Sequence, residues 1–143
     1  MNILCVCTGN ICRSPMMEYL LRQELEKQGI TDVTVSGAGI DTMDGIPASD
    51  HAVTVMKEIG LDITAHRSRQ LTKEIADGTD LCVVMTPEHG LKVVYYYDVE
   101  VEKILMPEGG IPDPFGGSLK TYRQCRDALI ESLPKLMEEI KNR

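Results

Sequence analysis

CTGNICRSP, residues 7–15, joins a short apolar run to a segment with helical spacing. The apolar run, residues 2–8, is rich in small and β-favouring residues and predicts a strand. In residues 14–28, Met17, Leu21 and Leu25 fall on one face, which predicts a helix. Pro15 suits its first turn, where a missing N–H costs nothing. The stretch therefore predicts a strand, a glycine-containing loop and a helix in succession.

The rest of the chain continues this alternation of strands and helices. Further strands are predicted at 32–36, 80–85 and 101–106, and further helices at 47–59, 72–76, 87–94 and 119–140. Pro134 is expected to kink the last helix, or to split it with Ser132 as a new cap. Short strand–helix connections predict an α/β fold: a four-stranded parallel sheet flanked by helices on both faces, forming a single domain over residues 1–143.

The net charge, the apolar runs and the cysteine content limit which partners and which location the protein can have. The chain has 143 residues and a formal net charge of −7, which argues against binding to nucleic acid or to an anionic membrane surface. No apolar run approaches the length of a membrane span, and no export signal is visible. Five cysteines without an export signal predict reduced thiols and a cytoplasmic location.

The loop between the first strand and the first helix has the features of an anion site. A loop folded over a helix N-terminus points several backbone N–H groups at one spot, and the helix dipole adds partial positive charge. Arg13 offers a planar fork of donors that matches phosphate oxygens. Cys7 ends the strand among the same donors, which stabilise a thiolate. The hydroxyl of Ser14 could donate to that sulfur.

A thiolate beneath a bound phosphate is aimed at phosphorus, so the expected chemistry is phosphoryl transfer through a phosphocysteine. The leaving group needs a proton, and a carboxylate can supply it and later activate water. Asp113, held between Pro112 and Pro114, follows the fourth predicted strand and would lie at the same sheet edge as Cys7. The alternative is that Asp-Pro merely initiates a turn.

Other interpretations of the loop are weaker. A lone strand cysteine is usually a packing residue, and a Cys-x5-Arg pair has many chance matches. The loop lacks the Gly-Lys-Ser/Thr ending of loops that bind nucleoside triphosphates. Zinc bound by Cys5, Cys7 and Cys12 would lack a Cys-x2-Cys pair and a nearby histidine. We therefore expect no metal and no cofactor.

The chain resembles the low-molecular-weight protein tyrosine phosphatases over essentially its full length. The resemblance rests on residues 6–16 (VCTGNICRSPM), on residues 66–71 (HRSRQL) and on Asp113-Pro114. It implies metal-independent hydrolysis with Cys7 as nucleophile, Arg13 as phosphate clamp and Asp113 as general acid and then base. The phosphate-binding loop would consist of Thr8, Gly9, Asn10, Ile11, Cys12, Arg13 and Ser14.

The family pattern also implies supporting residues. Asn10 resembles the residue that braces the loop, and His66 the one that hydrogen-bonds to it, although His66 could instead be a surface capping histidine. In the family a serine after the second strand bonds to this asparagine, whereas the matching position here is Gly37. Ser36, one place earlier, would face the other side of the strand. The brace is therefore expected to be incomplete or to be filled by water.

Cys12 matches the second cysteine of the family's loop. A thiolate with a neighbouring thiol suggests a reversible Cys7–Cys12 disulfide that protects Cys7 from irreversible oxidation. The alternative is that Cys12 is a packing residue.

Two branches of the family suggest different substrates. Protein arginine phosphatases carry threonine where this chain has Ile11, but they share the segment DPFGGS found at residues 113–118, and then Tyr122 and Arg126-Asp127. An apolar Ile11 offers a wall for an aryl ring, and Phe115 could stack on a phenyl ring or on a guanidinium group. Phosphotyrosine in a phosphorylated protein is therefore the favoured substrate, with phosphoarginine as the alternative. For the oligomeric state, we favour a monomer.

Two further functions are possible on the same fold. Arsenate reductases need two additional reactive cysteines, but Cys82 and Cys125 are predicted to lie in the core. A non-catalytic module that binds phosphoproteins would not need Cys7, Arg13 and Asp113 together. The run Tyr95–Tyr97 is interpreted as a helix end without an assigned function.

Overall fold

The computed structural model describes residues 1–143 and contains one parallel sheet with the strand order β2-β1-β3-β4. The strands are β1 (Asn2–Cys7), β2 (Thr34–Gly39), β3 (Leu81–Val84) and β4 (Ile104–Leu105). Parallel strands end at one common edge of a sheet, so Cys7, Gly39 and the residues that follow β3 and β4 meet there. The predicted α/β fold is confirmed.

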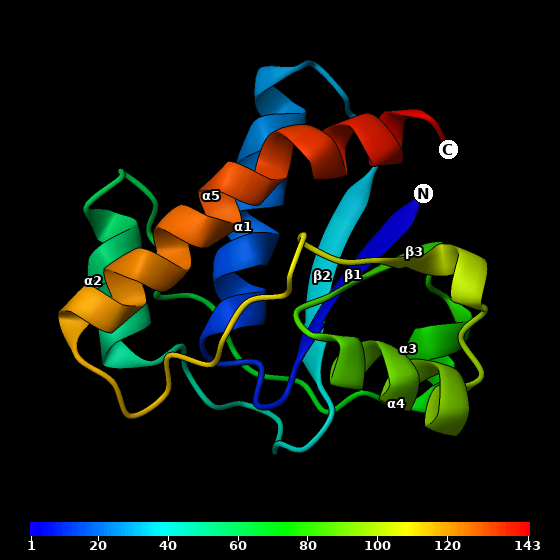
Figure 1. The fold of residues 1–143 in the computed structure, drawn as a ribbon, viewed down its shortest axis with the longest axis horizontal. Helices are drawn as coiled ribbons and strands as arrows, with labels where there is room; N and C mark the ends of the chain where they lie inside the picture. The colour runs from blue at the N-terminus through cyan, green and yellow to red at the C-terminus, as the bar shows by residue number, and fades with distance from the viewer.

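Helices cover both faces of this sheet (Figure 1). One face carries the long helices α1 and α5 together with α2, and the other carries the shorter α3 and α4. Their bounds are α1 (Arg13–Lys27), α2 (Asp50–Lys57), α3 (Lys73–Asp77), α4 (Pro87–Tyr97) and α5 (Leu119–Lys141), with a short 3-10 helix, η1, at Val101–Lys103.

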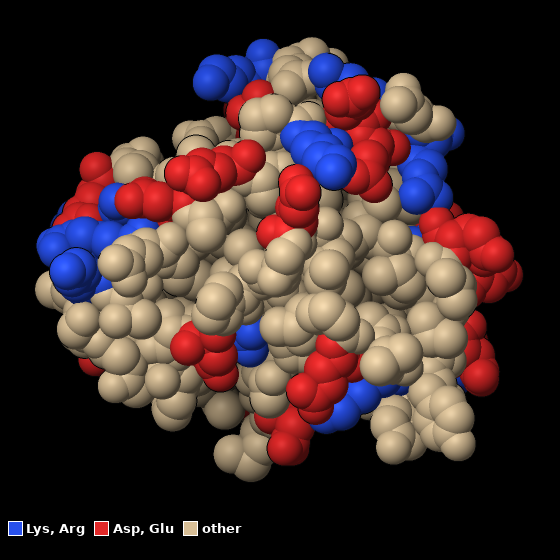
Figure 2. Space-filling model, viewed as in Figure 1, with Lys and Arg blue, Asp and Glu red and all other residues tan.

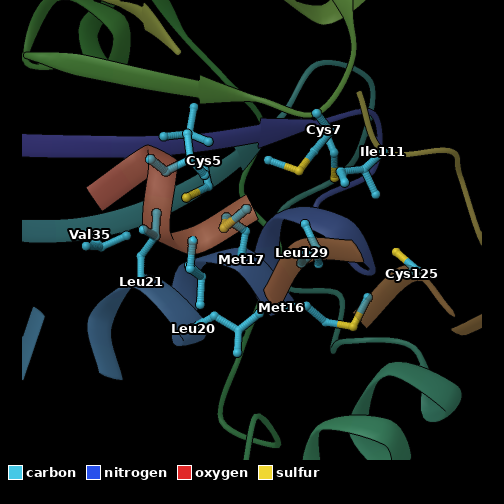
Figure 3. Close-up of a cluster of buried hydrophobic side chains, with 14 of the residues drawn as sticks. Cys5, Cys7, Met16, Met17, Leu20, Leu21, Val35, Ile111, Cys125 and Leu129 are labelled. Carbon is cyan, nitrogen blue, oxygen red and sulfur yellow. The ribbon is translucent and has the colours of Figure 1, made fainter. Parts of the chain in front are cut away.

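Alternate residues of β1 serve two separate cores. Ile3 and Cys5 point toward α1 and α5, whereas Leu4 and Val6 point toward α3 and α4. Figure 3 shows the larger core, with Cys5 above the methionine and leucine side chains of α1 and Cys7 at the end of its strand. Because β1 is buried on both faces, its C-terminal residue is held firmly against the sheet.

The second strand differs from the prediction because it runs three residues further. Residues 37–39 (GAG) follow the predicted strand, yet they pair with Cys5, Val6 and Cys7 as part of β2. A Cβ on Gly39 would lie 2.7 Å from the carbonyl oxygen of Thr8, so only glycine lets β2 lie this close to the loop after β1.

Three other expectations differ from the structure: the start of the second helix, the length of the fourth strand, and a split of the last helix at Ser132. Helix α2 begins at Asp50 rather than at residue 47, because Pro47 forms an isolated antiparallel bridge with Arg67. Strand β4 has two residues instead of six, because the residues before it form η1. Helix α5 is continuous through Pro134, and Ser132 donates its hydroxyl proton to the Leu129 carbonyl instead of capping a new helix.

The surface carries acidic and basic side chains mixed over the face in Figure 2, without a broad basic area. None of the helices is both long enough and apolar enough to cross a membrane.

Candidate active site

Cys7 is the last residue of β1 and lies beneath the loop that leads into α1. Its side chain is buried, and its sulfur is 3.0 Å from the hydroxyl of Ser14 and accepts a hydrogen bond from the backbone N–H of Asn10 at 3.3 Å. Asn10 has a φ of 55°, in the left-handed region that asparagine tolerates better than most residues. This conformation folds the loop back over the sulfur.

The hydrogen-bond donors around the sulfur can be assigned. The side-chain amide of Asn10 donates to the Ser14 oxygen at 2.7 Å. Because that oxygen already accepts a proton from Asn10, its own hydroxyl proton is free to point at Cys7. Ser14 therefore donates to the sulfur and stabilises negative charge on it.

The loop also holds donors without partners. The backbone N–H groups of Gly9, Ile11 and Cys12 donate to no other group of the protein. Arg13 is 4% exposed, and its Nε is the only buried side-chain nitrogen or oxygen that has no hydrogen-bond partner. Unpaired buried donors are costly unless a ligand satisfies them, and these fit a tetrahedral oxyanion.

The rest of the Arg13 guanidinium is anchored to the segment before α5. Nη1 donates to the carbonyl oxygen of Ile111 at 2.9 Å, and Nη2 lies 3.6 Å from the Asp113 carboxylate. Asp113 accepts a further hydrogen bond from the backbone N–H of Phe115 at 3.1 Å, while its side chain remains half exposed. The structure thus brings Asp113 close to Cys7 and Arg13, although Asp113 lies about 100 positions later in the sequence.

A cavity of about 440 Å³ opens above the sulfur. Ile11 is half-buried on one side of it, and Phe115, which is 67% exposed, stands at the rim. The cavity is lined by Cys7, Thr8, Gly9, Ile11, Cys12, Arg13, Asp41, Thr42, Met43, Ile46, Asp113 and Phe115.

His66 and the backbone of Arg69 brace Asn10 behind the loop, although the family's serine is missing. His66 is buried, with its Nε2 2.6 Å from the carbonyl oxygen of Asn10, and the backbone N–H of Arg69 donates to the Asn10 side-chain oxygen at 3.0 Å. A Cβ on Gly37 would lie 2.8 Å from a carboxylate oxygen of Glu18 and 2.9 Å from the Asn10 amide nitrogen. Those side chains therefore occupy the space that a serine would fill.

Ser36 points to the opposite face of β2, as expected, and its hydroxyl accepts a hydrogen bond from Arg69 Nη2 at 3.2 Å. The oxygen of the Asn10 amide and one of its two N–H protons have protein partners, so the gap left by the missing serine is limited to the second N–H proton.

Cys12 belongs to the loop, and its sulfur lies 3.3 Å from the hydroxyls of both Ser49 and Tyr122. Burial raises the pKa of Cys12, so it is a neutral thiol at pH 7. Burial also raises the pKa of Cys82 and of Cys125 to about 12. No three His, Cys, Asp or Glu side chains are grouped closely enough to hold a metal ion.

Fold and loop together define a cysteine-dependent phosphoric monoester hydrolase. The chain belongs to the low-molecular-weight protein tyrosine phosphatase family. The family model described as "Low molecular weight phosphotyrosine protein phosphatase" matches residues 2–143.

Similar proteins of nearly the same length include some named as arginine phosphatases and others named as tyrosine phosphatases. A protein-arginine-phosphatase of Geobacillus stearothermophilus is 38% identical, over 98% of this chain and 96% of its own. A low molecular weight protein tyrosine phosphatase from T. tengcongensis has a TM-score of 0.90 at 36% identity, with 97% of this chain and 99% of that chain covered. The YwlE arginine phosphatase, in a variant with a phosphorylated active-site serine, has a TM-score of 0.91 at 34% identity, covering 99% and 96%.

Sequence reasoning missed four residues around the loop: Glu18, Asp41, Arg69 and His89. Glu18 lies beside Gly37 because α1 packs against β2, and Arg69 reaches the brace because its segment bonds to the end of β2. His89 follows β3, so its position at the carboxyl edge of the sheet was the one available signal.

Proposed function

We propose that this protein hydrolyses phosphotyrosine in phosphorylated proteins through a phosphocysteine formed on Cys7. The observation that carries the proposal is the set of unpartnered donors, Arg13 Nε and the loop N–H groups, on residues that line one cavity together with the buried Cys7. Such donors stabilise the charge that develops on the transferring phosphoryl group.

Each step follows from the contacts of the site. The Cys7 thiolate attacks phosphorus while Arg13 and the loop N–H groups hold the three phosphoryl oxygens. The phosphorus–oxygen bond to the tyrosine breaks, and Asp113 gives its proton to the departing phenolic oxygen. Water then attacks the phosphocysteine, Asp113 takes up a proton from it, and phosphate leaves. Ser14 stabilises the thiolate released in this second step.

The relative with the phosphorylated active-site serine supports the covalent intermediate, because in that protein the phosphoryl group lies on an active-site side chain.

We prefer phosphotyrosine to phosphoarginine as the substrate because the apolar side chain of Ile11 lines the cavity together with Cys7. Ile11 presents an apolar side chain to the cavity and cannot hydrogen-bond to a guanidinium group. Tyr122 and Arg126 resemble the arginine branch but serve the packing of α5 instead. Tyr122 contacts Cys12 and Ser49, and Arg126 donates to the carbonyl oxygen of Val55 and pairs with Glu58.

Phosphoarginine is the second candidate substrate. The segment at residues 113–118 matches that branch, and relatives named as arginine phosphatases are as similar as those named as tyrosine phosphatases. Hydrolysis of matched phosphotyrosine and phosphoarginine peptides, measured side by side, decides between the two.

Replacing Ile11 with threonine is expected to shift the ratio of the two kcat/KM values toward phosphoarginine by about tenfold or more, since a hydroxyl would then be available to the guanidinium group. The matched control is Ile46→Thr, at another half-buried isoleucine of the same cavity. An unchanged ratio in Ile11→Thr, or an equal shift in the control, would refute this role.

We also propose that Cys12 protects Cys7 from oxidation. Peroxide converts the Cys7 thiolate to a sulfenic acid, the Cys12 thiol attacks that sulfur with release of water, and a thiol reductant later restores both groups. Both cysteines line the same cavity.

Peroxide-treated wild-type protein should therefore regain most of its activity after thiol reduction, whereas Cys12→Ser should regain little. Cys125→Ser controls for the loss of one of the five thiols. Equal recovery in the wild type and Cys12→Ser would disprove the protective role.

All five cysteines are unpaired and buried. On this basis we propose that the enzyme works in the reducing cytoplasm. A monomer remains the state that we favour from the sequence.

A further inference from the structure

His89 contacts the phosphate loop at Thr8, whereas His66 contacts it at Asn10. It is the third residue of α4 and is only 5% exposed. Its Nε2 lies 2.9 Å from the hydroxyl of Thr8, the residue directly after Cys7, and its Nδ1 lies 3.0 Å from the hydroxyl of Thr86. The imidazole thus bridges the start of the loop to the start of α4.

The hydrogen bonds of Thr86 favour one arrangement of protons. Thr86 is the N-cap of α4, and its hydroxyl oxygen accepts the backbone N–H of His89 at 3.3 Å. Its own hydroxyl proton can then go to Nδ1, which leaves the ring proton on Nε2. The Nε2–H group then donates to the hydroxyl oxygen of Thr8. The hydroxyl proton of Thr8 therefore needs a different acceptor.

The imidazole is neutral at pH 7. Burial, together with the nearby positive charge of Arg13, lowers the pKa of His89 to about 4. A neutral ring adds no charge beside the guanidinium and needs one defined tautomer.

We propose that His89 is a positioning residue that fixes the Thr8 side chain so that its hydroxyl donates to a phosphoryl oxygen. Thr8 is an exposed residue that lines the cavity together with Cys7 and Arg13. A hydroxyl proton of Thr8 that is not donated to His89 is therefore available to an anion bound in this cavity. His66 holds the backbone of Asn10, so the two histidines act on different parts of the loop. This inference deepens the proposed function and rests on it.

The test is a double-mutant cycle of His89→Leu and Thr8→Val, with inorganic phosphate as the probe. Each single variant should raise the Kd of phosphate, measured by calorimetry, by about two- to tenfold, the effect of one hydrogen bond. KM for the phosphopeptide should rise similarly and kcat should change less, because Thr8 contacts the phosphoryl group before and during the reaction. In the double variant, His89→Leu should add little to the effect of Thr8→Val.

Glu88→Gln is the matched control, since Glu88 precedes His89 on α4 and pairs only with exposed Lys92. Thr8 is exposed, so Thr8→Val is expected to fold. The Kd of phosphate in Thr8→Val therefore tests the inference even if His89→Leu fails to fold. Additive losses in the cycle, or an unchanged Kd of phosphate in Thr8→Val, would overturn the inference. Absence of turnover in wild-type protein that still binds phosphate would instead count against the proposed function alone.

Discussion

Replacing Cys7 with serine should lower kcat by at least about 10⁴-fold, the scale seen when an enzyme loses its nucleophile. The serine hydroxyl is a much weaker nucleophile at neutral pH than a thiolate, and no general base lies beside it, since Ser14 is a donor to this position. The loop donors and Arg13 remain, so phosphate should still bind with a Kd close to that of the wild type.

The measurement combines steady-state turnover with intact-protein mass. A slow attack by the serine would leave one phosphoryl group on the protein, as in the relative with the phosphorylated serine. Cys125→Ala, which removes a core thiol on α5, is the control and should keep full turnover. Substantial steady-state hydrolysis by Cys7→Ser would exclude a phosphocysteine mechanism.

Replacing Asp113 with asparagine should lower kcat by about 10² to 10⁴-fold for phosphotyrosine. The loss comes from the leaving group, because tyrosine departs as a poor phenolate unless it is protonated. The effect should shrink steadily as the leaving group becomes more acidic across a series of aryl phosphates. Plotting log kcat against the acidity of the leaving phenol, for wild type and variant, gives the comparison.

Asp41 provides a matched control for Asp113 because both carboxylates line the cavity and both are exposed. Asp113 differs in its fixed position, with one contact to Arg13 and one to the Phe115 N–H. Asp41→Asn should leave the dependence on leaving group unchanged. If Asp41→Asn showed the steeper dependence instead, the proton donor would be Asp41.

Much of the site could be predicted because its core is contiguous in sequence. One strand, one loop and one helix turn hold Cys7, Asn10, Arg13 and Ser14, and strong local patterns define all three elements. Asp113 was also accessible, since a parallel sheet places the ends of its strands at one edge. The predictions for Cys7, Arg13 and Ser14 needed only local patterns and the topology of α/β folds. The role of Asn10, and the choice of Asp113 as the proton donor over a simple turn, came from the resemblance to the family.

The remaining contacts depend on packing between distant segments. Glu18 fills the space beside Gly37 only because α1 packs against β2, which no local pattern reveals. Similarly, α5 stays continuous because Leu129, Leu133 and Leu136 lie in one core on both sides of Pro134. Their burial outweighs the roughly 3 kcal/mol that a proline costs inside a helix.

Gly37 and Glu18 also constrain how this chain can change over evolutionary time. A mutation that adds a side chain at position 37 would push against the Asn10 amide as well as the glutamate, so it would disturb catalysis before it could add a new hydroxyl brace. Shortening residue 18 first would remove the carboxylate contact but would leave the Asn10 amide nitrogen 2.9 Å from a Cβ at position 37. The two positions should therefore show epistasis, with the order that shortens residue 18 first passing through the less impaired intermediate.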